Sequence, residues 1–204
     1  WAQVAAERPS FAEVVARLRP PERELLIFVC SPSISPLSNA LPEALAVDAA
    51  CWQGGGVCEI VAQDTTAQQL RAKLVAQSTR RLLFIGHADA DDPAGAGHTL
   101  GFTAAGGGLE TVNAQDVASV LGNVGTGNGG ALDLCFLNGC CSEALGRAAR
   151  DRGVATVVCW STRALDSAAR LFSTTFFETI HLHRSSCRQA FDEAVRAVRV
   201  ETLA

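Results

Sequence analysis

Two stretches of the chain decide the fold: "RLLFIGHAD" at residues 81–89 and "LDLCFLNGCCSEALGRAARD" at residues 132–151. Each begins with an apolar run of strand length and then reaches a glycine, which is followed at once by His87 or Cys140. Near-continuous apolar runs are typical of strands that lie in a parallel sheet covered on both faces. The two stretches therefore predict parallel strands whose carboxyl ends carry an imidazole and a thiol.

Three further apolar runs extend this pattern along the chain. The five predicted strands cover residues 25–30, 57–62, 81–86, 132–138 and 154–161. Between them, apolar residues recur with helical spacing, which predicts helices at residues 41–50, 66–77, 113–121, 143–150, 164–180 and 188–200. Strands that alternate with helices predict a three-layer, doubly wound α/β domain with a mostly parallel sheet. The Gly-rich stretch "HTLGFTAAGGGLETV" at residues 98–112 predicts an inserted hairpin.

The bulk composition excludes several functional classes. The net charge of −4 does not match the basic footprint of a nucleic-acid-binding protein. The sequence has no apolar run of 18 residues, so no membrane partner is predicted. Most of the eight cysteines lie among apolar residues, which predicts reduced thiols and a cytoplasmic location. The chain has no CxxC pair, and we expect neither a metal site nor another cofactor.

The first 18 residues, "WAQVAAERPSFAEVVARL", differ from the rest. Ser10 and Glu13 form a capping box at the start of an amphipathic helix. The order of the Trp, the Arg-Pro-Ser-Phe turn and the helix resembles the last helix of a protein kinase domain. This resemblance implies a kinase tail at residues 1–19, a kinase domain upstream in a longer parent protein, and a main domain at residues 20–204. The alternative is that residues 1–18 are the first helix of the main domain. The catalytic motifs of a kinase are absent from this sequence, so it predicts no kinase activity.

His87 and Cys140 are the candidate catalytic pair. Side chains just beyond the carboxyl ends of neighbouring parallel strands share one edge of the sheet, where ligand sites form. Cys140 also precedes a predicted helix, whose N-terminal N–H groups stabilise a thiolate. A neighbouring imidazole takes the thiol proton and later returns it to a leaving amine. Cys141 is the rival nucleophile, and a redox-sensing pair of Cys140 and Cys141 is a further alternative.

Three stretches, at residues 82–89, 134–180 and 187–198, resemble a CHAT domain. CHAT domains are relatives of caspases and separases in the clan of cysteine peptidases with the caspase–hemoglobinase fold. The resemblance covers about residues 22–200 and implies a caspase-like form of the predicted sheet. The separation of about 50 positions between His87 and Cys140 also matches caspases.

The resemblance implies a role for each residue of the site. His87 is the general base, Cys140 is the nucleophile, and the backbone amides of Ala88 and Cys140 form the oxyanion hole. The implied substrate contacts are Trp160, Ser161 and Asp89. Asp89 belongs to an acidic cluster with Asp91 and Asp92, which is either a solvated loop or a contact for basic substrates, as in metacaspases.

The predicted function is that of a cysteine endopeptidase that acts on a protein or peptide within a larger, kinase-containing signalling protein. The chain has "HA" and "NGC" where caspases have "HG" and "QAC", and no Arg stands in a matching place. An acidic substrate residue before the scissile bond is therefore expected to be disfavoured. Arg163 is the one residue whose charge would favour such a substrate instead. The alternative function is an inactive CHAT scaffold or protein-interaction module.

Overall fold

The computed structural model describes residues 23–63, 65–88, 90–91, 98–104 and 106–201. The predicted kinase-like tail at residues 1–19 lies outside this part of the chain, as does Asp89. The boundary between the two predicted domains therefore stays a prediction.

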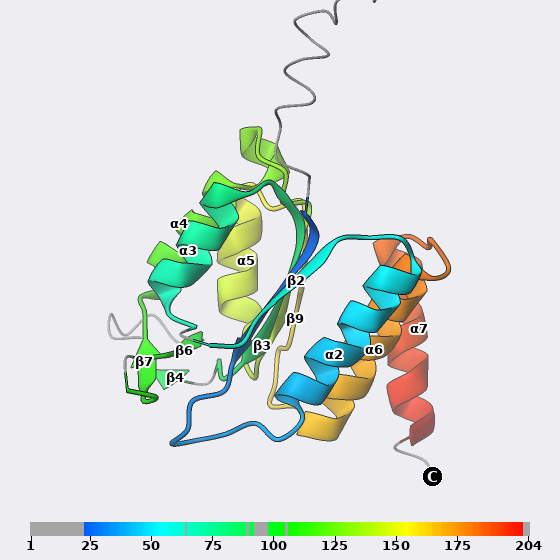
Figure 1. Ribbon diagram of the computed structural model, residues 1–204, viewed down its shortest axis with the longest axis horizontal. Coiled ribbons are helices and arrows are strands. Elements are labelled where there is room, and N and C mark those ends of the chain that lie inside the picture. Colours follow the sequence, from blue (N-terminus) through cyan, green and yellow to red (C-terminus); the bar gives the residue numbers. More distant parts are fainter. Residues whose placement is uncertain (1–22, 64, 89, 92–97, 105, 202–204) are drawn as a thin grey trace, which may run out of the picture.

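Five parallel strands form the central sheet of the described residues, in the order β2-β1-β3-β8-β9 (Figure 1). Their bounds are β1 Arg23–Cys30, β2 Cys58–Val61, β3 Thr79–Gly86, β8 Leu134–Asn138 and β9 Thr156–Cys159. All five predicted strands are confirmed, with shifts of up to two residues at their ends. Every pairing within this sheet is parallel, as the buried apolar runs indicate.

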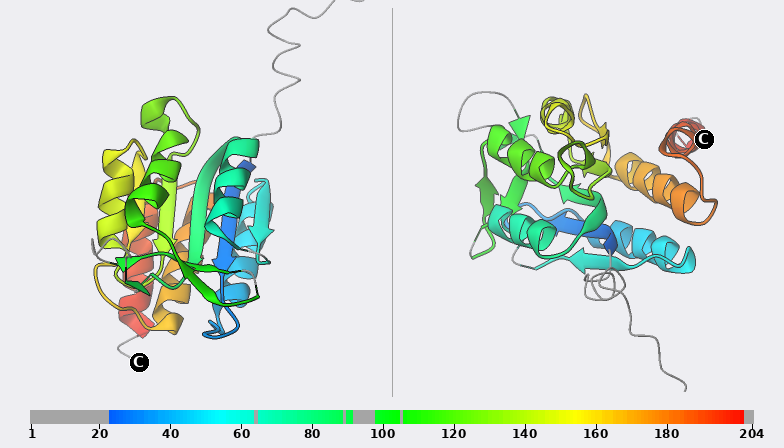
Figure 2. Two further views of the ribbon diagram at one scale, coloured as in Figure 1. Left: turned by 90° about the vertical axis from the view of Figure 1, so that its left-hand side faces the viewer. Right: turned by 90° about the horizontal axis from the view of Figure 1, so that it is seen from above.

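Helices cover both faces of the sheet (Figures 1 and 2). One face carries α3 (Ala67–Ala76), α4 (Ala114–Asn123) and α5 (Glu143–Asp151), and the other carries α2 (Ala40–Gln53), α6 (Asp166–His181) and α7 (Cys187–Glu201). Successive residues of a strand point to opposite faces, so Leu26 packs into one core and Ile27 into the other. The α/β class and the layered parallel sheet are thus confirmed.

The helix α2 confirms the helix predicted at residues 41–50 but does not bury all of its apolar residues. Leu41 and Leu45 contribute to the helical spacing, and both side chains are about half exposed. The face that α2 buries instead carries Ala40, Glu43, Ala44 and Val47. The alanine side chains on this face are small, so the helix can pack closely against its neighbours. Glu43 lies on the same face and is buried.

The predicted hairpin follows the third strand of the sheet. Strands β6 (Gly101–Thr103) and β7 (Leu109–Thr111) pair antiparallel, and Phe102 anchors them in the core through an edge contact with Phe84, with ring centroids 5.7 Å apart. Two shorter strands, β4 (Ala90–Asp91) and β5 (His98–Thr99), also pair antiparallel and were not predicted. The stretch at residues 124–130, which follows α4, contains a single 3₁₀ turn, Thr126–Asn128.

Phe136 of β8 fixes the position of α6. Its ring contacts Phe172, Phe176 and Phe177 of α6, with centroids between 5.5 and 6.0 Å apart. Aromatic pairs at such separations add to the apolar area that they bury. These contacts hold α6 against β8, and Nδ2 of Asn138, the last residue of β8, donates to the carbonyl oxygen of Ala169 in the first turn of α6 at 3.4 Å. None of the described helices is both long enough and apolar enough to span a membrane.

Candidate functional site

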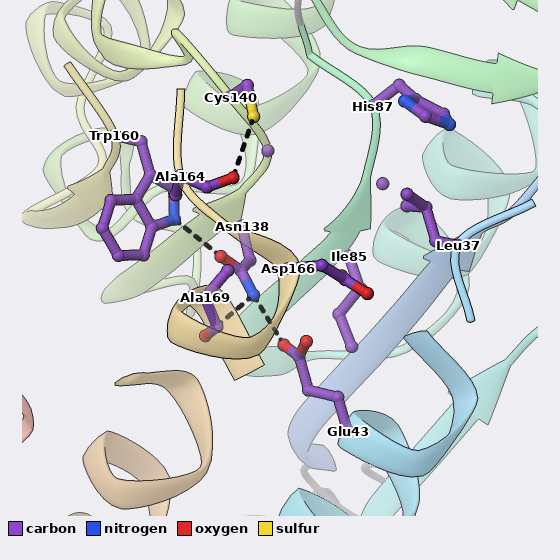
Figure 3. A pocket seen from close by; sticks show the side chains of 12 residues that line it. Leu37, Glu43, Ile85, His87, Asn138, Cys140, Trp160, Ala164, Asp166 and Ala169 are labelled. Carbon is purple, nitrogen blue, oxygen red and sulfur yellow. Dashed lines mark hydrogen bonds between the residues drawn. The ribbon is translucent and has the colours of Figure 1, made fainter. Parts of the chain in front are cut away.

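The register between β3 and β8 brings His87 and Cys140 level with each other. Ile85 of β3 pairs with Asn138 of β8, and each candidate residue lies two positions beyond its paired residue. Because the strands are parallel neighbours, both side chains lie at the same edge of the sheet. The two residues line one cavity of about 210 Å³ (Figure 3). The other residues that line it are Leu37, Glu43, Ile85, Gly86, Asn138, Gly139, Trp160, Ala164, Asp166 and Ala169.

The backbone of the loop after β1 orients the imidazole of His87. The Nε2 atom of His87 lies 2.8 Å from the carbonyl oxygen of Ser35. A carbonyl oxygen only accepts hydrogen bonds, so Nε2–H is the donor and the Ser35 oxygen is the acceptor. In the tautomer with the proton on Nε2, the Nδ1 atom keeps its lone pair, which is the form that a general base needs.

Cys140 lies in a tight turn between β8 and α5. The next residue, Cys141, has a φ of 55°, a left-handed conformation that is uncommon outside glycine. The Ser142 hydroxyl fixes this turn, because it donates to the carbonyl of Leu137 at 3.0 Å and accepts from the backbone N–H of Trp160 at 3.2 Å. The thiol therefore stands at the N-terminal side of α5, where N–H groups and the helix dipole favour an anion.

The thiol and the imidazole lie on opposite sides of the cavity (Figure 3). Both residues belong to the described part of the chain, and no hydrogen bond is observed between them. The Cys140 Sγ atom instead lies 3.8 Å from the carbonyl oxygen of Ala164. Catalytic hydrogen bonds often form only once a substrate is in place, so this geometry is compatible with a working pair.

A chain of hydrogen bonds between buried polar side chains forms the floor of the cavity. The indole N–H of Trp160 donates to Oδ1 of Asn138 at 2.6 Å, and Nδ2 of Asn138 donates to Oε1 of Glu43 at 2.7 Å. The Ser173 hydroxyl donates to the same Glu43 oxygen at 2.7 Å. Glu43 is only 1% exposed, and burial raises the pKa of its carboxyl to about 7, against the opposing effect of the hydrogen bonds from Ser173 and Asn138.

The structure places the remaining predicted residues in different ways. Trp160 lines the cavity, whereas Ser161 is exposed and lies outside the lining. Ala88 is fully buried, and its methyl group packs beside Gly139 instead of facing the cavity. Cys141, the rival nucleophile, and Arg163 also lie outside the lining.

Asp166 lies at the start of α6, beside the cavity. It is the first residue of α6, where Leu165 is the N-cap, and its carboxylate accepts a hydrogen bond from Nδ2 of Asn39 at 2.6 Å. The Asp166 side chain lines the cavity and adds a second carboxylate to that of Glu43.

Sequence reasoning missed Glu43, Asn138 and the carbonyl of Ser35. A backbone carbonyl has no sequence signal, because every residue carries one. Asn138 is a polar residue at the end of an apolar run, and Glu43 is a carboxylate on the small-residue face of a helix. Both features are visible in the sequence and indicate a buried polar group that needs partners.

The described residues contain no group of three or more His, Cys, Asp or Glu side chains that could hold a metal ion. No protein-family model matches the chain, and no curated protein matches it. The resemblance to a CHAT domain therefore depends on the quoted stretches of sequence alone.

Gly139 allows the two site-bearing turns to approach each other closely. A Cβ atom at this position would lie 2.6 Å from the Ala88 Cβ and 2.8 Å from the carbonyl oxygen of Gly86. We expect Gly139→Ala to lower the free energy of unfolding by about 1–3 kcal/mol, because the backbone must shift. Urea unfolding measures this effect. The matched control is Gly108→Ala, since the nearest atom to its added methyl would be 4.0 Å away. Equal effects of the two substitutions would contradict the packing argument.

The buried carboxyl of Glu43 makes stability depend on pH. Its pKa in the folded state, about 7, lies above the ordinary value of 4.5, so the folded protein binds the proton more tightly than the unfolded chain. The stability of the folded state therefore falls as the pH rises through the range between these two values. We therefore compare the free energy of unfolding of Glu43→Gln with that of the parent protein. The difference should shift in favour of Glu43→Gln by about 2 kcal/mol between about pH 5 and about pH 8. Urea unfolding of both proteins at the two pH values checks this, and a constant difference would exclude it.

Proposed function

We propose that this chain is a cysteine endopeptidase of the CHAT type with a caspase-like arrangement of its sheet, in which His87 is the general base and Cys140 is the nucleophile. The main support for the proposal is the register of β3 and β8, which places an imidazole and a thiol in the lining of one cavity. The position of Cys140 before α5 and the tautomer of His87 agree with these roles.

The chemistry follows from the two side chains. Nδ1 of His87 takes the proton from Sγ of Cys140, while Nε2–H stays bound to the carbonyl of Ser35. The thiolate attacks the carbonyl carbon of the peptide bond, and the imidazolium then gives its proton to the leaving amine. The resulting thioester is hydrolysed by water, which His87 deprotonates in turn, and this restores the free thiol.

The developing oxyanion needs donors, for which the backbone amides of Ala88 and Cys140 are the candidates. The support for this part of the proposal is the close approach of the two turns, since the Ala88 N atom lies 3.3 Å from where a Gly139 Cβ would stand. Backbone donors held in this way stabilise a tetrahedral intermediate at little reorganisation cost. Trp160 would form one wall for the substrate side chain that precedes the scissile bond.

One observation favours the second candidate, an inactive CHAT scaffold. The Cys140 thiol faces the carbonyl of Ala164 and is not hydrogen-bonded to His87. In a scaffold, the cavity would bind a partner segment without cleaving it. The kinase domain in the parent chain would then localise or regulate that binding.

A peptide probe with an acyloxymethyl ketone group distinguishes the two functions. This group alkylates a cysteine that a neighbouring base activates. We expect peptide mapping to place the label on Cys140, and Cys141→Ala to be labelled as fast as the parent protein. If iodoacetamide modifies Cys140 at the rate of an ordinary thiol while the probe does not react, the scaffold is the correct function.

A further inference from the structure

The outer side of α2 carries an apolar stripe, formed by Leu41, Leu45 and Trp52. Both leucines are about half exposed, and Trp52 in the last turn is 78% exposed. The other exposed residues of this helix, which are all uncharged, are Pro42, Ala49 and Gln53. Of the two carboxylates in α2, Glu43 is buried and Asp48 is half-buried. The solvent side of a surface helix normally carries polar and charged residues, so this stripe marks a surface that a partner covers.

The apolar stripe lies on the side of α2 that faces away from α6. Glu43 points toward α6, because the Ser173 hydroxyl of that helix donates to its carboxylate at 2.7 Å. Successive residues of an α-helix are offset by about 100°, so Leu41, Leu45 and Trp52 all lie within about 20° of the side opposite Glu43. On its other side, α6 separates α2 from α7 (Figure 1). The stripe is therefore on the outer flank of this helical layer.

The edge strand β2 lies at the same flank of the molecule. It contacts α2 (Figure 2), and among the described residues it pairs only with β1. The carbonyl of Val57, just before β2, accepts from the backbone N–H groups of Glu24 and Leu25 and so faces β1. The backbone groups of a strand point to alternate edges, so those of Cys58 and Ile60 are directed outward. Hydrogen-bonding groups and the apolar stripe thus lie beside each other on one surface.

A second copy of this chain fits both parts of this surface at once. A two-fold axis perpendicular to the sheet and beside β2 sets the two β2 strands antiparallel, so that one sheet continues into the other. Such an axis keeps α2 on the same face of the sheet in both copies, and the two apolar stripes then approach each other. The three side chains of the stripe expose on the order of 400 Å² per copy. With the strand edges, two copies reach about 1,200 Å², the area at which specific interfaces begin.

We propose that this chain forms a symmetric dimer through β2 and the apolar stripe of α2. The outward backbone groups of Cys58 and Ile60 pair with β2 of the second copy, and Trp52 packs against its α2. Each copy supplies the strand edge and the stripe that the other needs, whereas an added peptide strand would cover the edge alone. The cavity with Cys140 stays outside the interface, because β1 and β3 separate β8 from β2 in the sheet. This inference is independent of the peptidase proposal.

Sedimentation equilibrium of the full chain tests the proposal. We expect the mass of two chains at high protein concentration. Trp52→Glu should raise the dissociation constant of the dimer at least about a hundredfold, because it replaces a central aromatic contact with an unpaired charge. The matched control is Val200→Glu, which places the same charge at a residue of α7 that is 69% exposed and should leave the dimer unchanged. Both positions are mostly exposed, so neither change removes core packing.

Hydrogen exchange of the parent protein at low and high concentration locates the interface without any substitution. We expect the amides of β2 to exchange more slowly at high concentration, and those of β9, at the other edge of the described sheet, to be unaffected. Protection of β9 in place of β2, or an unchanged dissociation constant in Trp52→Glu, would overturn the proposal. So would a chain that is monomeric at about 0.1 mM, and this outcome would leave the surface to another partner, such as the kinase domain predicted upstream.

Discussion

Replacement of Cys140 by alanine is expected to lower the rate of peptide hydrolysis by at least about a thousandfold. The substitution removes the only atom that can form the proposed thioester and leaves the surrounding turn in place. His87→Ala should have a loss of similar order, because the thiol then has no base to take its proton and the leaving amine has no acid. A continuous assay with a fluorogenic peptide measures both effects.

Cys141→Ala is the matched control for this pair of substitutions. Cys141 adjoins the nucleophile but lies outside the cavity lining, so most of the activity should remain. A residual loss of a few-fold is compatible with the left-handed backbone at this position, because a change there can shift the turn that carries Cys140. Full activity of Cys140→Ala, or loss of activity only in Cys141→Ala, would show that Cys140 is not the nucleophile.

The parts of this site that were predictable are those that depend on periodicity and strand order. Apolar runs that end in Gly86-His87 and Asn138-Gly139-Cys140 predict two buried strands with reactive groups at their ends. The sequence does not state that these strands are neighbours, and the exact register of Ile85 with Asn138 depends on how both helical layers pack. The structure shows that the two strands pair, and this pairing places His87 and Cys140 in the lining of the same cavity.

The parts that were missed depend on long-range contacts. Glu43 lies 95 positions before Asn138 in the chain, yet the two side chains share a hydrogen bond. Glu43 and Ser173 also share a hydrogen bond, and they lie further apart still, at a separation of 130 positions. Local patterns indicate which residues are buried, but they do not indicate which buried polar groups meet, because this is decided by the packing of α2 against α6.

The second large effect concerns the residue that precedes the scissile bond. The cavity that adjoins Cys140 is lined by two carboxyl groups, those of Glu43 and Asp166. Among its described lining residues there is no Arg or Lys, and Arg163 is exposed outside it. A substrate Asp or Glu would bring a third carboxylate into this space, and like charges that meet in an interface cost several kcal/mol.

We therefore expect kcat/KM for peptides with Asp or Glu at this position to be at least about a hundredfold below that for matched peptides with Gln or Leu. The pKa of Glu43, raised to about 7 by burial, gives this preference a distinctive pH profile. Glu43 loses its proton as the pH rises from about 6 to about 8, so the discrimination against acidic substrates should deepen over that range. Glu43→Gln should keep a smaller and nearly constant discrimination, since only the charge of Asp166 then remains. A peptide library in which Asp dominates this position would refute the expectation and would point instead to Arg163 as the substrate contact.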